Sequence, residues 1–279
     1  MNDVVFLNGS FIPRSKAKIS ADDRGFQFAD GVYEVVKYYS GKPFRMEDHL
    51  QRLKSSLKEV QIAFDEIDEL SEIFNKLLKI NQLNFSDAGV YLQISRGINQ
   101  RVHYFPTDMV PTVYAFSFPF PSFAGNLENG IAVITAEDIR WLRCDIKSVS
   151  LLPNTMLFQQ AVEKGAGECV LIRNGFVTEA THSSVMGVKI GTIFTHPQSY
   201  LVLPGITRKV ILEICEKADI PVVEQAIGEP ELYTLDELII CGTGSEVTPA
   251  ISVNGHPVGS GKPGPVTRFL QEQLFALTK

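Results

Sequence analysis

The chain has few of the residues and segments that would place it in several large classes of protein. Its 279 residues carry a formal net charge of −6, with acidic and basic residues interspersed. Because no basic stripe stands out, nucleic acid is not expected as a partner. No apolar run approaches the length of a membrane span, and the N-terminus, Met1–Asp3, lacks the basic start of a signal peptide. We therefore expect neither a membrane partner nor export.

Cysteine and histidine are also scarce, and neither residue type shows the spacing of metal ligands. The four cysteines are far apart in the sequence, each in an apolar stretch: Cys144, Cys169, Cys215 and Cys241. We expect small buried thiols in a reducing cytoplasm, and no metal site. Four of the five histidines suggest no functional cluster and are expected to be structural or exposed: His49, His182, His196 and His256.

The remaining composition, 44% hydrophobic and 21% charged, is that of ordinary globular protein, without internal repeats or low-complexity segments. The Pro- and Phe-rich stretch 118–125 disfavours regular structure and suits a linker. We therefore predict an N-terminal α+β domain over 1–120, a linker over 121–130 and a barrel-like C-terminal domain over 131–279.

Periodicity and turn residues predict the elements of each domain. In the first domain these are an Asn-Gly hairpin over 6–12, a loop over 19–25, strands over 28–39, 90–95 and 112–117, and helices over 46–61 and 66–80. In the second they are strands over 131–135 and 238–241, hairpins over 169–179 and around 189–192, and helices over 155–164, 205–218 and 265–277. Short strands outnumber helices in the second domain, which favours a barrel-like arrangement.

The segment 139–152 is the most informative stretch of the chain. Interpreted as a strand, it places Leu142, Cys144 and Ile146 on one face, and Trp141, Arg143, Asp145 and Lys147 on the other. The apolar Leu151-Leu152 that follows suggests that the segment enters a core. A desolvated lysine has a free amine that can attack a carbonyl. On the pattern alone, a solvated strand face of alternating charge remains the alternative.

This segment, Arg140-Trp141-Leu142-Arg143-Cys144-Asp145-Ile146-Lys147-Ser148, resembles the lysine segment of the fold-type IV pyridoxal-phosphate enzymes, and most closely that of the D-amino-acid aminotransferases. The resemblance extends over nearly the whole chain, from Asp23 onward. It implies a two-domain α+β enzyme in which Lys147 carries pyridoxal 5'-phosphate as an internal aldimine. The implied reaction is transamination between D-amino acids, such as D-alanine or D-glutamate, and 2-oxo acids.

Such a cofactor needs a phosphate cradle and a partner for its pyridine nitrogen. The N–H groups of Ile206 and Thr207 follow a glycine at a helix start, which favours anion binding, and Thr243 lies in a second glycine-containing turn. An N-cap and an ordinary turn are the alternative. The resemblance adds Arg52, which could equally be a surface residue, and assigns Glu179, at a strand end, to the pyridine nitrogen.

Arg101, His103 and Tyr33 can all donate hydrogen bonds to one carboxylate, although a solvated loop with two basic side chains is the alternative for the first two. The resemblance implies that this trio binds the substrate carboxylate, with Arg101 and His103 supplied by the neighbouring subunit. We therefore expect a homodimer, with the cofactor in the cleft between the domains.

The chain departs from the family pattern at Thr181-His182, where Gly-Ser-Ser-Ser-Asn usually follows the glutamate, and at Gly242 and Gly244. These changes concern the shape of the pocket and the cofactor affinity. Within the same fold, a branched-chain L-amino-acid aminotransferase or an aminodeoxychorismate-lyase-like enzyme remains an alternative. A β-rich binding protein that kept the fold without the activity is the alternative from another class.

Overall fold

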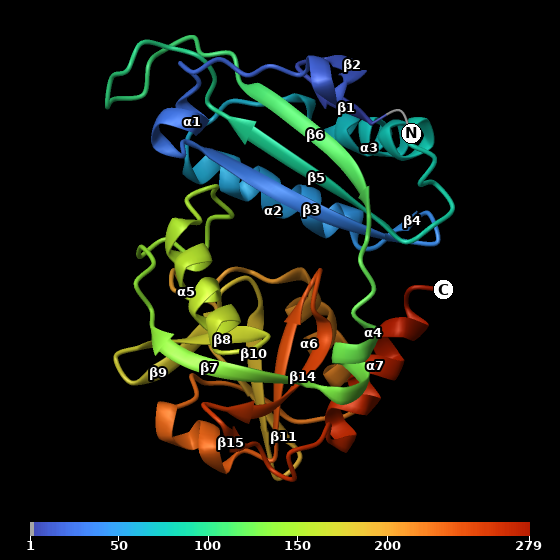
Figure 1. The fold of residues 1–279 in the computed structure, drawn as a ribbon, viewed down its shortest axis with the longest axis vertical. Helices are drawn as coiled ribbons and strands as arrows, with labels where there is room; N and C mark the ends of the chain where they lie inside the picture. Colours follow the sequence, from blue (N-terminus) through green and yellow to red (C-terminus); the bar gives the residue numbers. More distant parts are fainter. Residues whose placement is uncertain (1–2) are drawn as a thin grey trace. The chain divides into compact units, whose positions relative to one another are not determined.

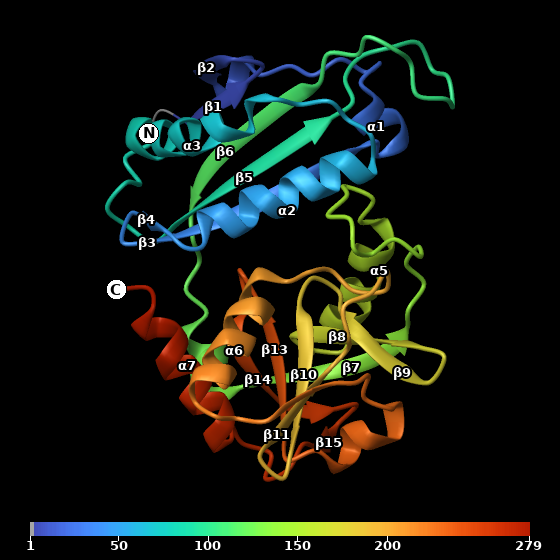
Figure 2. The same ribbon diagram turned by 180° about the vertical axis from the view of Figure 1, so that it is seen from behind.

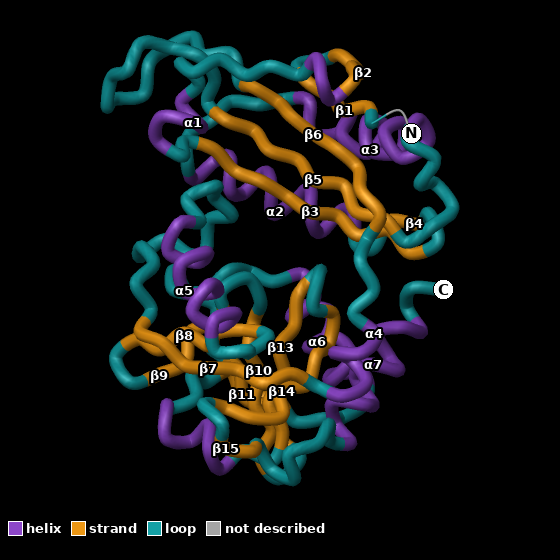
Figure 3. Tube along the Cα trace, viewed as in Figure 1, coloured by secondary structure: helices purple, strands orange, loops and turns teal. Residues whose placement is uncertain are grey.

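The computed structural model describes residues 3–279, which form two compact units. The first unit comprises the chain up to Pro121 together with Ile146–Ser150, and the second comprises Ser122–Asp145 and Leu151–Lys279. Figures 1 and 2 show the helices and strands of each unit from two sides, and Figure 3 shows the same trace coloured by type of structure. Met1 and Asn2, which entered the expectation about export, lie outside the described residues.

An antiparallel sheet of six strands is the framework of the first unit. Its order is β2(Ser10–Pro13), β1(Val4–Leu7), β6(Thr112–Pro119), β5(Ala88–Ser95), β3(Gly31–Tyr39) and β4(Lys42–Pro43). The predicted hairpin between β1 and β2 is confirmed, with Asn8 and Gly9 at φ values of 45° and 82° in its turn. The stretch 118–125 is less irregular than predicted, because β6 continues to Pro119, a residue that a strand end tolerates.

Three α-helices belong to the first unit: α1(Arg24–Phe28), α2(Met46–Glu59) and α3(Leu70–Ile80). The helix predicted over 46–61 is confirmed, and the one predicted over 66–80 divides into a 3₁₀ turn, η2(Glu66–Glu69), and α3. The loop predicted over 19–25 and a strand starting at Phe28 are wrong where α1 lies. Asp23 caps this short helix by accepting a 2.8 Å hydrogen bond from the Gly25 N–H, which stabilises the helical turn.

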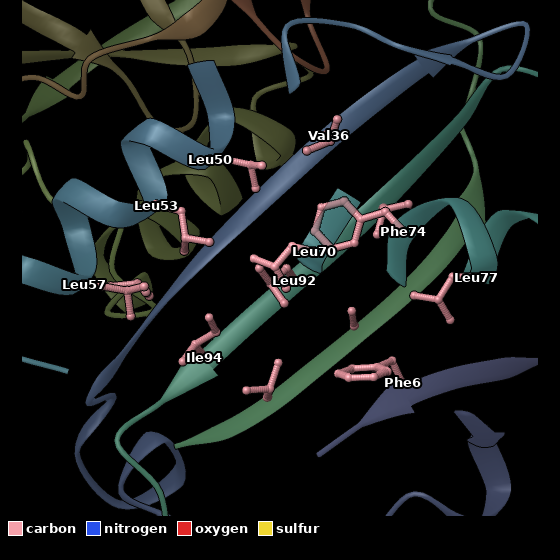
Figure 4. Close-up of a cluster of buried hydrophobic side chains, with 14 of the residues drawn as sticks. Phe6, Val36, Leu50, Leu53, Leu57, Leu70, Phe74, Leu77, Leu92 and Ile94 are labelled. Carbon is pink, nitrogen blue, oxygen red and sulfur yellow. The ribbon is translucent and has the colours of Figure 1, made fainter. Parts of the chain in front are cut away.

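Helices α2 and α3 bury their apolar sides against one face of this sheet (Figure 4). The core includes side chains from both helices and from the strands: Leu50, Leu53, Leu57, Leu70, Phe74, Leu77, Val36, Leu92 and Ile94. Alternation along β3 directs Val32, Glu34 and Val36 to the same face. A carboxylate therefore points from the sheet into the layer beneath α2.

The segment Ile146–Ser150 lies beside the start of β3 but does not form a strand with it. Tyr33 donates its N–H to the Lys147 carbonyl at 3.0 Å, and a single bridge joins Val32 to Ser148. The strand predicted over 139–152 is therefore wrong. The chain turns at Cys144–Asp145, so no continuous ladder forms.

The side-chain pattern predicted for this segment is only partly correct. Cys144 and Ile146 are buried as expected, whereas Leu142 is 65% exposed. Leu152 is 71% exposed and begins a helix, so the expectation that the chain enters a core here is also wrong.

The second unit is built on a sheet of nine strands that curls into a half-barrel (Figure 1). Its order is β12(Val222–Glu224), β11(Thr192–Thr195), β10(Ser184–Lys189), β13(Glu237–Gly242), β14(Glu246–Val253), β7(Ile131–Glu137), β8(Glu168–Arg173) and β9(Phe176–Ala180), with β15(His256–Pro257) paired to β14. The predicted barrel-like architecture and the Asn174-Gly175 hairpin between β8 and β9 are confirmed.

The helices of the second unit are α4(Ala124–Asn129), α5(Leu152–Glu163), α6(Ile206–Lys217) and α7(Pro265–Ala276), with a 3₁₀ turn, η3(Glu229–Thr234). Pro265 opens α7 at its first position, as predicted. All four cysteines are free and buried, as expected. Among residues 3–279, no helix combines the length and the apolarity needed to cross a bilayer.

Candidate active site

Lys147 is fixed in the first unit by contacts to both neighbouring elements. Its N–H donates to the Ser56 hydroxyl of α2 at 3.1 Å, while its carbonyl accepts from Tyr33 on β3. The Lys147 ammonium lies 4.4 Å from the centre of the Tyr33 ring. The backbone of this residue is thus held on two sides, and its side chain contacts the Tyr33 ring.

A buried cluster of charged and polar side chains joins α2 to β3 in the same unit. Arg52 donates from Nε and Nη2 to the two Glu34 oxygens at 2.7 and 2.8 Å, and His49 Nδ1 lies 2.8 Å from Oε2 of the same carboxylate. Although burial opposes ionisation, Arg52 and His49 hold the pKa of Glu34 well below its usual value. Arg52 is therefore a buried, paired residue and not one on the surface.

His49 completes this cluster as a neutral ring. Burial lowers its pKa below the usual 6.5, Glu34 offsets part of this change, and the charges of Arg52 and Lys147 lower the pKa further. Since the Glu34 carboxylate can only accept, Nδ1 of His49 carries the proton in their hydrogen bond.

Glu179 occupies a comparable position in the second unit, buried on β9. Its Oε2 accepts from the Leu203 N–H at 3.0 Å, and its Oε1 accepts from Arg140 Nη1. Burial raises the pKa of the Glu179 carboxyl, and the adjacent Arg140 guanidinium offsets part of that rise. A carboxylate held in this way can accept a hydrogen bond from a protonated nitrogen, as the proposed ring partner requires.

Arg140 was not predicted as a functional residue, although it begins the lysine motif. Its guanidinium also donates to both oxygens of Asp138, at 2.9 Å each, and Asp138 accepts from the Thr178 hydroxyl at 2.9 Å. Burial acts against it, but Asp138 and Glu179 raise the pKa of Arg140 above its usual value. The alternation of charges around this arginine was the only signal in the sequence, and it did not identify the partners.

Three segments of the second unit converge where the phosphate cradle was predicted. Gly205 caps α6, and a Cβ built on it would lie 2.7 Å from the Ser184 hydroxyl. The hydroxyls of Ser183 and Ser245 lie 2.9 Å apart, which joins the start of β10 to the turn that contains Thr243. Ser183, Ser184 and Ser245 thus add hydroxyls that were not predicted as site residues.

The chemistry of this convergence fits a phosphate group. Ile206 and Thr207 stand in the first turn of α6, whose N–H groups have no partner within the helix and favour an anion. The hydroxyls of Thr207 and Thr243 make no hydrogen bond to another residue among 3–279, so both are available to a ligand. Gly205 leaves room for close approach of the chain to an anion.

Thr181 and His182, which depart from the family pattern after Glu179, contact a separate buried carboxylate. Thr181 donates to the buried Glu168, and His182 Nδ1 lies 3.0 Å from the second oxygen of that carboxylate. The Thr181 carbonyl accepts from Asn154 of α5 at 2.6 Å. Thr181 therefore has a buried hydrogen-bond partner in Glu168, and His182 lies beside the same carboxylate.

The predicted carboxylate trio is only partly assembled within one chain. Arg101 and His103 lie in the segment between β5 and β6, and both contact the Phe28 ring, at 4.7 and 5.5 Å. Tyr33 instead stacks with Tyr91 at 5.8 Å. Among residues 3–279, no hydrogen bond or ring contact joins Tyr33 to either basic side chain, and no cluster of three or more potential ligands is placed to hold a metal.

Comparisons with known proteins show the family to which the chain belongs. The family model for amino-transferase class IV matches residues 31–253. D-alanine aminotransferase from Staphylococcus haemolyticus is 45% identical over 270 residues, covering 96% of this chain and 95% of that protein. The corresponding enzyme of Bacillus licheniformis is 43% identical over 272 residues, covering 97% and 95%.

Among solved structures, the branched-chain amino acid aminotransferase of Escherichia coli superimposes with a TM-score of 0.93 at 29% identity, covering all of this chain and 95% of that one. The fold is therefore that of the fold-type IV aminotransferases. The chain belongs to the class-IV aminotransferase family.

Proposed function

We propose that this protein is a pyridoxal-phosphate-dependent aminotransferase that moves the amino group between D-amino acids, such as D-alanine and D-glutamate, and 2-oxo acids. The observation that carries the proposal is the identity of about 43–45% to D-alanine aminotransferases over nearly the full length of the chain. Lys147, Arg52, Glu179 and Thr207 support it, since each has surroundings suited to its proposed role.

Six residues are proposed to hold the cofactor. Lys147 is the proposed covalent anchor, Arg52, Ile206, Thr207 and Thr243 would hold the phosphate, and Glu179 would accept a hydrogen bond from the pyridine nitrogen. When bound, pyridoxal phosphate supplies a carbonyl carbon for the amino group and a conjugated ring that draws electrons from the substrate α-carbon.

Lys147 is proposed to remove the proton from the substrate α-carbon as a general base. An amine can do this only when it is released from its covalent role and kept near the reacting carbon. The hydrogen bonds from the backbone of Lys147 to Ser56 and Tyr33 support this task, because they hold the base of the side chain.

Glu179 is proposed to keep the pyridine nitrogen protonated, because a nearby negative charge favours a cation. The Arg140 guanidinium supports the ionised form of Glu179, because it offsets part of the rise in pKa that burial causes. Arg140 would thus act through Glu179, without itself touching the substrate.

Tyr33, Arg101 and His103 are proposed to bind the substrate carboxylate in a homodimer, with the last two residues supplied by the partner. Two observations support an assembly of this kind. Among residues 3–279, Tyr33 makes no hydrogen bond or ring contact with the other two, and the loop that carries them exposes large apolar side chains, Tyr104, Phe105 and Val110. The four buried free cysteines support a cytoplasmic location.

The handedness of the substrate would follow from this carboxylate site. D- and L-amino acids present the same three groups around the α-carbon in mirror order. Once the α-hydrogen faces Lys147 and the carboxylate is fixed, only one enantiomer places its side chain in the remaining space. An L-amino acid would have to leave the carboxylate site unfilled and lose its charge-assisted hydrogen bonds.

The direct test is to offer D-alanine and an L-branched-chain amino acid separately to the purified protein loaded with pyridoxal phosphate. We expect D-alanine to change the visible absorption of the cofactor and to yield pyruvate with a 2-oxo acid acceptor. A change in cofactor absorption with the L-branched acid alone would support the branched-chain alternative. That alternative also has the similarity to the Escherichia coli structure in its favour. A protein that stays colourless with added cofactor would refute both.

A further inference from the structure

One aromatic ring in the first unit contacts both of the basic residues assigned to the substrate carboxylate. Phe28 is the last residue of α1, and the Arg101 guanidinium carbon lies 4.7 Å from the centre of its ring. The His103 ring meets it in a T-shaped arrangement at 5.5 Å. Among residues 3–279, Arg101 forms no ion pair with a carboxylate, and its guanidinium contacts the Phe28 ring.

The loop that carries this pair lacks regular secondary structure between Ser95 and Thr112, apart from one bridge between Ile98 and Asp23. Exposed side chains on such a loop would ordinarily sample several rotamers, and each would have to be ordered on binding a ligand. A contact that fixes them beforehand lowers that cost. Phe28 is placed to provide it.

Phe28 is itself held by Arg24, one turn before it on α1. The Arg24 guanidinium carbon lies 4.6 Å from the ring centre, and the side chain is only 2% exposed. Its Nε donates to Asp30 at 2.7 Å, and its Nη1 donates to the Val102 carbonyl at 2.6 Å. Since Val102 lies between the two basic residues, Arg24 fixes the ring and the loop backbone together.

We propose that Phe28, held by Arg24, is a positioning residue that orients Arg101 and His103 for the substrate carboxylate. This inference rests on the proposed function, which assigns that role to the pair. An arginine over an aromatic face is attracted by the ring quadrupole, whereas an aliphatic side chain of similar volume lacks this attraction. The ring therefore adds direction that packing alone would not supply.

The test compares Phe28→Leu with the unchanged enzyme, both loaded with pyridoxal phosphate. We expect the KM for D-alanine to rise about three- to tenfold, from the usual strength of a cation–π contact, with kcat and the cofactor absorption unchanged. Inhibition by acetate, a carboxylate without an amino group, should weaken by a similar factor. Phe28→Tyr keeps the aromatic face, so its KM for D-alanine and its inhibition constant for acetate should match those of the unchanged enzyme.

Phe26→Leu is the matched control. Phe26 lies on the same short helix and is 79% exposed, and it makes no ring or cation contact among residues 3–279. Phe26→Leu should leave the KM for D-alanine and the inhibition constant for acetate unchanged. An equal rise in KM for Phe26→Leu would overturn the inference, because a general disturbance of α1 would then explain the result. Should Phe28→Leu fail to fold, Phe28→Met takes its place.

A double variant separates the inference from the proposed function. If Phe28 acts through Arg101 and His103, then adding Phe28→Leu to the double variant Arg101→Ala with His103→Ala should leave the KM for D-alanine as it is in that double variant. Additive effects would overturn the inference. A KM that rises for Arg101→Ala but not for Phe28→Leu would refute the positioning role alone. A KM unchanged by Arg101→Ala would refute the assignment of the carboxylate site, and the inference with it.

Discussion

Replacing Glu34 by Gln should destabilise the first unit, because this carboxylate is the counter-ion of a buried arginine. It accepts two hydrogen bonds from Arg52, at 2.7 and 2.8 Å, and a third from His49 at 2.8 Å. Removing one partner of a buried ion pair costs about 3–5 kcal/mol, because the remaining charge is left without compensation. Gln keeps one acceptor oxygen, so we expect a loss near the lower end, about 3 kcal/mol.

Urea denaturation followed by circular dichroism measures this loss. With a slope of roughly 1–3 kcal/mol per molar urea, the midpoint should fall by about 1–3 M. The control is the double variant Glu34→Gln with Arg52→Met, which removes both charges and should recover part of the stability. A loss below about 1 kcal/mol in the single variant, or a double variant that loses the sum of both single effects, would refute the reasoning.

The same pair predicts a pH dependence with a definite sign. The pKa of Glu34 is lowered from 4.5 in the folded protein. The contribution of the Glu34 carboxylate to folding stability is therefore complete above pH 4.5, and it is lost as the pH falls towards the folded-state pKa. The difference in stability between the unchanged protein and Glu34→Gln should therefore be constant near neutral pH and shrink below about pH 4.5. A difference that grows on acidification would contradict the lowered pKa.

Three further predictions concern the anchor, the cradle and the thiols. Lys147→Ala should lose the visible absorption of the loaded enzyme and nearly all turnover, and ordinary turnover would rule out its role. Gly205→Ala places a Cβ 2.7 Å from a serine hydroxyl and should weaken cofactor binding severalfold in dialysis against pyridoxal phosphate, unlike Gly125→Ala, whose Cβ meets nothing within 4 Å. Burial raises the pKa of Cys169 and Cys241 to about 12, so these thiols should react with a disulfide reagent at pH 8 only in denaturant, and rapid reaction of the folded protein would contradict this.

The elements that depend on local chemistry were predictable from the sequence. Asn8-Gly9 and Asn174-Gly175 supply two positive-φ positions each, and both hairpins occur where the dipeptides predict them. The apolar stripe of α2 was equally plain. The five-residue helix α1 was not predictable, because a helix of this length shows no periodicity and depends on the Asp23 cap.

The features that depend on distant partners could not be predicted in the same way. The alternation of side chains around Lys147 favoured a strand. In the structure, the backbone of Lys147 bonds instead to the start of β3 and to a serine of α2, and no continuous strand pairing forms. Arg140 entered the prediction only as the first residue of the lysine segment, and its partners, Asp138 and Glu179, are identified only by the fold. Residue roles came from the resemblance, whereas burial and pairing required the structure.

The membership of Ile146–Ser150 in the first unit has a consequence for synthesis of the chain on the ribosome. Ile146 belongs to the hydrophobic core of that unit, but 24 residues, Ser122–Asp145, lie between it and Pro121, where the first continuous part of the unit ends. At roughly 5–20 residues per second, the nascent sheet and helices wait about 1–5 s for the residues that complete their core. The anchoring lysine arrives with them, so the first unit is finished only after translation of the second has begun.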